Sequence, residues 1–209
     1  MNKSFYSIAL LYAMISCGGS GEENTSTAND STKTTQEVID EPEIENSFVL
    51  ESGTVGIFHI GAPISELPEV LNSRVGKVTT QVNGETIEHD AFIIFNSMED
   101  VAELILEADT SKMDEERTII EMKVISNYYE TAEGIKVGSL VAEFGEKYTD
   151  ASYRYSSTSG EIIAETTARA GVEFIIDPAG CTKKIGKTDL TLSSSNFNET
   201  ASIKYIRVK

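Results

Sequence analysis

Basic residues are scarce in this sequence. Its 17 lysines and arginines are outnumbered by 34 aspartates and glutamates, which gives a net charge of −17 at pH 7. Lys3, Lys33 and eight of the acidic residues precede residue 47, so the rest of the chain keeps a net charge of −11. An acidic body repels phosphate backbones and anionic lipid surfaces. We therefore expect no nucleic-acid binding.

Histidine is also scarce, with only His59 and His89 in the chain. Adjacent residues on a strand point to opposite faces, so His89 and its neighbours Glu88 and Asp90 cannot converge on one metal ion. The serines at 193–195 lack a Gly-x-Ser-x-Gly elbow, and "GIKVGS" lacks the Lys-Ser/Thr ending of a phosphate-binding loop. The sequence thus indicates no catalytic residues, no metal or cofactor site and no small-molecule substrate.

The apolar run near the N-terminus is too short to span a membrane as a helix. It covers Phe5 to Ile15, broken only by Ser7, whereas a spanning helix needs roughly 20 residues. After the basic Lys3, this length is typical of a secretory signal peptide.

The run ends in "MISC", which resembles the lipobox of bacterial lipoproteins, with Met14 where that family most often has leucine. In that family the cysteine thiol is diacylated and becomes the new N-terminus. The resemblance implies a signal peptide over residues 1–16 and a lipid anchor, palmitate for example, on Cys17. An ordinary signal peptide cut elsewhere is the alternative.

Lipidation of Cys17 would leave Cys181 as a single thiol, so we expect a fold without an intramolecular disulfide. Two lysines follow Cys181 in "DPAGCTKK" and could make its thiol more acidic. A loop thiol without a neighbouring base is nevertheless expected to be inert.

Residues 17–46 have the composition of a disordered acidic tether. The stretch from Gly18 to Asn46 carries eight acidic residues and one lysine, with almost no large apolar residues. Such a segment cannot bury enough surface to offset its ordering entropy. Its early acidic residues, Glu22 and Glu23, resemble surface-export signals of Bacteroidota lipoproteins. We expect an outer-membrane location and leave open the leaflet, and also whether Ser31 or Thr32 carries a glycan.

Two similar stretches, "GIFHIGAPISE" and "GIKVGSLVAE", open the two halves of the remaining chain. With Gly61 aligned on Gly138, each half shows alternating apolar residues, a glycine turn and apolar residues at helical spacing. The apolar positions are Ile64, Leu67, Val70 and Leu71 in one half and Val141, Phe144 and Tyr148 in the other. Ser65 and Ser139 are the expected capping residues of these two short helices.

The rest of each half also corresponds. Asn83-Gly84 predicts a hairpin, and Ser159-Gly160 occupies the matching place. "FIIF" (92–95) matches "FIID" (174–177), and the closing apolar residues recur at equal spacing. We therefore predict an α+β fold made of two tandem strand–short helix–antiparallel sheet repeats, over residues 47–127 and 128–209.

One segment fits two templates. In residues 97–108, Ser97 and Asp100 have the spacing of a helix cap, yet Ala102, Leu104 and Leu106 alternate as in a strand. We favour the strand because the segment follows a predicted hairpin.

The "IKVGSLVAEFGEKY" opening, followed by a hairpin-rich half, resembles two groups of binding proteins. These are the SmpA/OmlA-type outer-membrane lipoproteins and the β-lactamase inhibitory protein, itself a tandem repeat. The resemblance implies a non-enzymatic protein that binds or supports the assembly of an envelope protein. An inhibitor or sensor of an extracellular hydrolase is the alternative, and an enzyme built from scattered acidic residues is a further one.

Tyrosines are the candidates for the interaction surface, because tyrosine offers a large apolar face with a polar tip. Four of them lie in the connector and in the first hairpin of the second half: Tyr128, Tyr129, Tyr153 and Tyr155. Tyr128 and Tyr129 could instead pack the two halves together.

Overall fold

The protein is described in a computed structural model. The residues that the structure describes are 49–67, 72–96, 99–109, 111–113 and 116–209, and all of them belong to one compact unit, Pro42–Lys209. The predicted signal peptide, Cys17 and the whole predicted tether lie outside the described residues. In the described part, no helix has the length and apolar character needed to cross a membrane.

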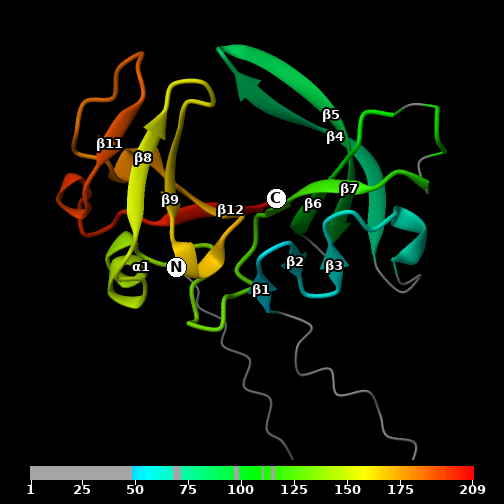
Figure 1. The fold of residues 1–209 in the computed structure, drawn as a ribbon, viewed down its shortest axis with the longest axis horizontal. Coiled ribbons are helices and arrows are strands. Elements are labelled where there is room, and N and C mark those ends of the chain that lie inside the picture. Colours follow the sequence, from blue (N-terminus) through cyan, green and yellow to red (C-terminus); the bar gives the residue numbers. More distant parts are fainter. Residues whose placement is uncertain (1–48, 68–71, 97–98, 110, 114–115) are drawn as a thin grey trace, which may run out of the picture. The chain divides into compact units, whose positions relative to one another are not determined.

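A nine-stranded antiparallel sheet dominates the unit (Figure 1). Its strands along the chain are β4 (Ser73–Val82), β5 (Glu85–Phe95), β6 (Asp100–Leu106), β7 (Ile119–Val124), β8 (Ser152–Ser156), β9 (Glu161–Glu165), β10 (Val172–Ile176), β11 (Leu190–Leu192) and β12 (Ile203–Val208). Their order across the sheet is β11-β8-β9-β10-β12-β7-β6-β5-β4. The last strands of the two chain halves, β7 and β12, are therefore neighbours, and each half runs outward from this pair.

Smaller elements surround the sheet. They are β1 (Leu50–Glu51), β2 (Thr54–Val55), β3 (Phe58–His59), the helix α1 (Val141–Lys147) and the 3-10 turns η2 (Ile64–Glu66), η4 (Thr167–Arg169), η5 (Pro178–Gly180) and η6 (Ser194–Asn196). The first three strands form a separate antiparallel sheet. The fold is thus mainly β with one α-helix, and the expected α+β class holds in this coarse form. Strands from both predicted ranges, 47–127 and 128–209, share one sheet.

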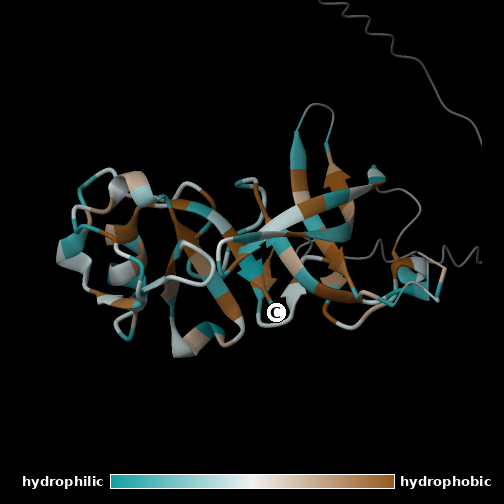
Figure 2. Cartoon of the chain, turned by 90° about the horizontal axis from the view of Figure 1, so that it is seen from above, coloured by the Kyte–Doolittle hydropathy of each residue, from teal (hydrophilic) through white to brown (hydrophobic). Residues whose placement is uncertain are grey.

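The main hydrophobic core lies on one face of the large sheet, and a small second cluster of Val78, Ala91 and Ile105 lies on the opposite face. Apolar and polar residues alternate along the strands, as the brown and teal segments in Figure 2 show. In the central pair, Met122 and Val124 of β7 and Ile206 and Val208 of β12 are all fully buried. Phe144 of α1 packs against Phe174 of β10, with 4.7 Å between ring centroids. The apolar face of a strand needs such cover, which here comes partly from the helix.

Several local predictions are confirmed. Asn83 and Gly84 have φ of 55° and 82° and join β4 to β5, as the Asn-Gly pair predicts. β8 and β9 form the second predicted hairpin, with Gly160 at a φ of 72°. The ambiguous segment contains a strand, β6, and not a helix. Ser97 itself lies outside the described residues.

Three other predictions are wrong. In the first half, a single 3-10 turn, η2 (Ile64–Glu66), stands where a helix was expected. Leu67 is extended because it precedes Pro68, and proline disfavours helical geometry in the residue before it. Val70 and Leu71 lie outside the described residues. Ser139 does not cap α1, because its hydroxyl accepts from the Lys136 N–H at 3.1 Å. Ser65 lies inside η2, whose N-cap residue is Pro63, and no side-chain cap bond is made there.

The predicted match between "FIIF" and "FIID" is the third error. Residues 92–95 belong to β5, which is next to an edge, whereas residues 174–176 belong to β10, which is next to the central pair. A short apolar run fits any buried strand, so its composition does not identify the neighbours of that strand.

Candidate functional site

The polar face of the large sheet carries a continuous set of charged side chains, which we call the charged face. Its members come from β6, β7, β8, β9, β10 and β12, and from Lys209, which follows β12. They are Glu103, Glu121, Lys123, Arg154, Glu161, Glu165, Glu173, Tyr205, Arg207 and Lys209. They alternate in sequence with core residues, so the strand period places them opposite the core.

Arg207 is the centre of the charged face and is only 9% exposed. Its Nη2 atom lies 2.8 and 2.7 Å from the two carboxylate oxygens of Glu161, and its Nη1 atom lies 2.7 Å from Glu173. Glu121 approaches Nε at 3.4 Å. One guanidinium thus pairs with carboxylates from three strands, β7, β9 and β10. The register of β10 and β12 places Glu173 directly opposite Arg207.

Burial and hydrogen bonding compete in this cluster. Burial lowers the pKa of Arg207, but hydrogen bonds to Glu161 outweigh it and raise that pKa overall. Burial raises the pKa of Glu161, yet hydrogen bonds from Arg207 and Tyr205 lower it on balance. Glu121 is different, because burial raises its pKa and the more distant Arg207 only partly offsets this effect. The cluster therefore holds two kinds of carboxylate, one firmly ionised and one less so.

The outer members of the charged face are also paired. Lys209 Nζ lies 3.0 Å from Glu173, and Lys123 Nζ lies 2.9 Å from Glu103. Arg154 binds Glu165 through Nε at 3.1 Å, and its Nη2 also reaches Glu173 at 3.4 Å. Glu173 therefore contacts three cations. Burial raises its pKa, but Lys209 and Arg207 lower it on balance.

The tips of two hairpins meet beside this face. The Asn83 N–H, at the tip of the β4–β5 hairpin, donates to the Thr158 carbonyl oxygen in the β8–β9 turn at 2.7 Å (Figure 1). Beneath them lie adjoining hollows of about 230 and 130 Å³, both lined by Thr80, Glu121 and Arg207. His89 borders the larger hollow, where its Nε2 atom lies 2.9 Å from the Thr80 hydroxyl.

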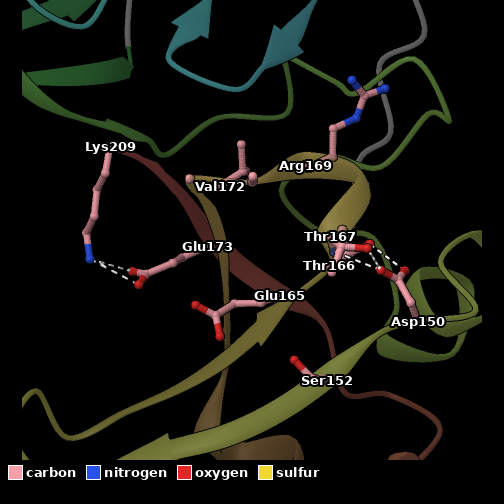
Figure 3. A pocket seen from close by; sticks show the side chains of 11 residues that line it. Asp150, Ser152, Glu165, Thr166, Thr167, Arg169, Val172, Glu173 and Lys209 are labelled. Carbon is pink, nitrogen blue, oxygen red and sulfur yellow. Dashed lines mark hydrogen bonds and ion pairs between the residues drawn. The ribbon is translucent and has the colours of Figure 1, made fainter.

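A larger hollow of about 370 Å³ lies at the other end of the charged face (Figure 3). Glu165, Glu173 and Lys209 line it, and Figure 3 shows Arg169 pointing away from them. Asp150, on its rim, accepts hydrogen bonds from the Thr166 hydroxyl at 2.6 Å and the Thr167 N–H at 2.8 Å. These bonds lower the pKa of Asp150 to about 2 and hold η4 in place.

The Arg169 side chain forms an ion pair behind this hollow that predicts a pH dependence of stability. Its Nη2 atom lies 2.8 and 2.9 Å from the two Glu133 oxygens, and the Tyr148 hydroxyl donates to Glu133 at 2.6 Å. Although burial acts the other way, these bonds lower the pKa of Glu133 from 4.5 to about 2. The stabilisation is therefore complete above pH 4.5 and is lost as the pH falls towards 2.

We expect Glu133→Gln to lower the free energy of unfolding by about 1 kcal/mol at pH 7, a figure reduced for solvent screening. The difference between wild type and variant should shrink as the pH falls from 4.5 towards 2, because Glu133 becomes protonated in the wild type over this range. Urea unfolding at several pH values measures it. A difference that stays constant from pH 7 to pH 2.5 would contradict the role of the Glu133 charge.

The charged face can act as a preformed set of donors and acceptors. Each basic member described here is engaged by a carboxylate, while Glu121 and Glu165 keep part of their acceptor capacity, because they are 21% and 39% exposed. Among the described residues, no group of three or more histidine, cysteine or acidic side chains is arranged to hold a metal ion.

The four tyrosines do not form one surface. Tyr128 is 53% exposed, but Tyr129 and Tyr153 are only 7% and 6% exposed and belong to the core. Tyr155 is half-buried against the same core. Tyr153 and Tyr155 alternate with Arg154 on β8, so the strand period turns both tyrosines towards the apolar face.

The remaining sequence candidates lie apart from each other. His59 is exposed, and Cys181 is half-buried with its Sγ atom 3.6 Å from the Lys183 carbonyl oxygen. Sequence reasoning missed Glu173 and Arg207. Each is a single charge between apolar neighbours in a strand, and this pattern could have identified them as buried ion-pair partners.

Comparison with known proteins gives no family and no curated protein that matches the sequence. Among solved structures, the uncharacterized protein yfeY from Escherichia coli is similar, with a TM-score of 0.48 and 14% identity. The alignment covers 78% of this chain and 99% of that chain. A score at that level carries neither fold nor function over to this chain.

Proposed function

We propose that this protein is a lipid-anchored, non-catalytic binding module of the bacterial cell envelope, held at the outer membrane through Cys17. Its charged face is the surface that binds another envelope protein. The observation that carries this proposal is the network around Arg207, whose side chains are fixed by one another before any partner arrives. A fixed polar surface loses little side-chain entropy on binding.

The charge of the face indicates the chemistry of the partner. Carboxylates outnumber cations on it, Glu121 and Glu165 keep acceptor capacity, and the body of the protein is acidic. A long-range negative potential attracts a basic surface and repels an acidic one. The partner surface is therefore basic, with arginine or lysine side chains that reach the hollows beside Glu121 and Glu165.

Photo-crosslinking in intact cells tests this proposal. A photoreactive residue at exposed Ser152, which lines the hollow in Figure 3, should crosslink to one envelope protein. The matched control is exposed Glu146 on α1, a position away from the charged face. Equal crosslinking from both positions, or from neither, would contradict a partner on the charged face.

The anchor makes a separate prediction. Cys17→Ser removes the thiol that accepts the diacylglyceryl group, so labelled fatty acid should be absent from the variant and the protein should leave the membrane fraction. Stable anchoring needs more than one acyl chain, which a diacylated cysteine provides. Labelling of the variant at the wild-type level would show that another residue carries the lipid.

We also propose that the two halves of the chain are a duplicated unit. Gly61 and Gly138 have φ of 85° and 89°, and each donates its N–H to the first residue of a central strand, whose own N–H donates to the residue after the glycine. The bonds are Gly61 N to Ile119 O (2.8 Å), Ile119 N to Ala62 O (3.0 Å), Gly138 N to Ile203 O (2.8 Å) and Ile203 N to Ser139 O (2.9 Å). This equivalence of four bonds supports duplication of the opening segment together with its final strand.

Equivalent glycines should respond equally to substitution. A Cβ atom at Gly61 or Gly138 meets nothing within 4 Å, so only the left-handed backbone resists it. We expect Gly61→Ala and Gly138→Ala each to lower the free energy of unfolding by about 1–2 kcal/mol. Gly186→Ala is the control, because that site is equally open and lacks a positive φ. Unequal losses at the two glycines would weaken the duplication.

A further inference from the structure

We propose that the outer edge of β4 binds an extended segment of a partner protein, which adds a tenth strand to the large sheet. The segment carries acidic residues and β-branched residues. This inference goes beyond the proposed function because it concerns the edge of the sheet and not the charged face, so either can fail alone.

The two edges of the sheet are very different. β11 at one edge has three residues, whereas β4 at the other has ten, and its pairing with β5 runs from Ser73↔Ile94 to Val82↔Glu85 without a register shift. Among the strands that the structure describes, none pairs with the outer side of β4. Proteins usually protect an edge that must stay unpaired by shortening it, bulging it, placing proline in it or giving it charged side chains. Of these features, β4 has only its two cations, Arg74 and Lys77.

The hairpin turn determines which backbone groups of β4 point outward. Asn83-Gly84 is a two-residue turn, so Val82 and Glu85 form the first hydrogen-bonded pair and every second residue of β4 bonds to β5. The N–H and C=O groups between them face away from β5. They belong to Ser73, Val75, Lys77, Thr79 and Gln81.

The side chains of β4 indicate the chemistry of the added strand. Val75 is 57% exposed, a large value for an apolar strand residue, and would pack against a β-branched residue of a neighbouring strand. β4 contains Arg74 and Lys77 and no acidic residue, in a body that is otherwise acidic. These cations are paired with Asp100 and Glu88, but their side chains are still 49% and 61% exposed. Opposite charges across strands attract, so the added strand carries carboxylates.

A second copy of this chain fits the edge less well. It would bring another acidic body with a net charge of −11 beside the first. It would also bring a second β4, whose Arg74 and Lys77 would repel their counterparts. The occupant is therefore an acidic extended segment of a different protein.

A capped peptide that repeats threonine, glutamate, threonine and valine three times is the probe. It is titrated into the full-length protein in detergent, and hydrogen exchange is followed at the amides of β4. We expect about tenfold slower exchange at the outward N–H groups of Val75, Lys77 and Thr79, and no change at the inward amides of Val78 and Thr80. Protection of both sets alike, or of neither, would overturn the proposal.

Two substitutions at one outward position sharpen the test. Thr79→Pro removes an outward N–H that β5 does not use, and it should weaken peptide binding about tenfold, which is 1.4 kcal/mol. Thr79→Ala keeps the N–H and should bind within about threefold of wild type. Equal binding by the two variants would overturn the proposal, and so would equal binding of a peptide with lysine in place of glutamate. A concentration-dependent dimer in sedimentation, lost in Thr79→Pro, would identify a second copy as the occupant and also overturn it.

Discussion

Arg207→Ala is expected to lower the free energy of unfolding by about 3–5 kcal/mol, the loss that follows when one partner of a buried ion pair is removed. In the wild type, the guanidinium contacts Glu121, Glu161 and Glu173, and it is nearly inaccessible to water. Removal of the guanidinium leaves these carboxylates close together. The nearest cation that remains is Lys209, which pairs with Glu173. Urea unfolding at pH 7 measures the loss.

The expected pH dependence distinguishes this mechanism from a simple packing defect. Ion pairing lowers the pKa of Glu161 and Glu173 in the wild type, so its stabilising effect is present at neutral pH and lost as the pH falls. The difference between wild type and Arg207→Ala should therefore shrink below pH 4.5. Arg74→Ala is the control, because Arg74 forms an exposed pair with Asp100, and exposed pairs contribute little to stability. A loss at Arg207 no larger than at Arg74 would show that the network is not stabilising.

Phe144→Ala is expected to lower the free energy of unfolding by about 3–5 kcal/mol through lost burial and a residual cavity. Phe144 is 1% exposed, and its ring lies 4.7 Å from Phe174, 4.9 Å from Tyr148 and 6.2 Å from Tyr153, measured between centroids. α1 has only seven residues, too few to be stable without this contact. We therefore also expect lower helicity in the circular dichroism spectrum of the variant.

Two further substitutions serve as controls for Phe144. Glu146→Ala lies on the exposed side of the same helix and should change stability by less than about 0.5 kcal/mol. In the first half of the chain, Ile64 is 5% exposed whereas Leu67 is only partly buried, so Ile64→Ala should cost more than Leu67→Ala. A cost for Phe144→Ala similar to that of Glu146→Ala would mean that the helix is held by other contacts.

Local chemistry in the sequence determined the turns and most of the strands. Asn83-Gly84 and Gly160 predict their hairpins because these residues adopt positive φ at little cost. The alternation predicts the burial of Met122 and Val124 in β7 and of Ile206 and Val208 in β12, but it does not predict that Ile119 is buried and Ile120 exposed. Glu173 and Arg207 each lie between apolar residues of a strand, so the sequence could have identified them as members of buried ion pairs. It could not have identified their partners.

Only the tertiary structure decided which strands are neighbours, and with them the charged face. A period of two fixes the face on which a residue lies, but it says nothing about the strand beside it. Arg207 is 46 residues from Glu161 and 34 from Glu173, and the pairing of β12 with β10 and of β10 with β9 brings them together. Phe144 and Phe197, also distant in the sequence, pack against Tyr153, which is buried although the sequence placed it on the surface. Burial and ion pairing depend on contacts between distant segments, and no local pattern contains them.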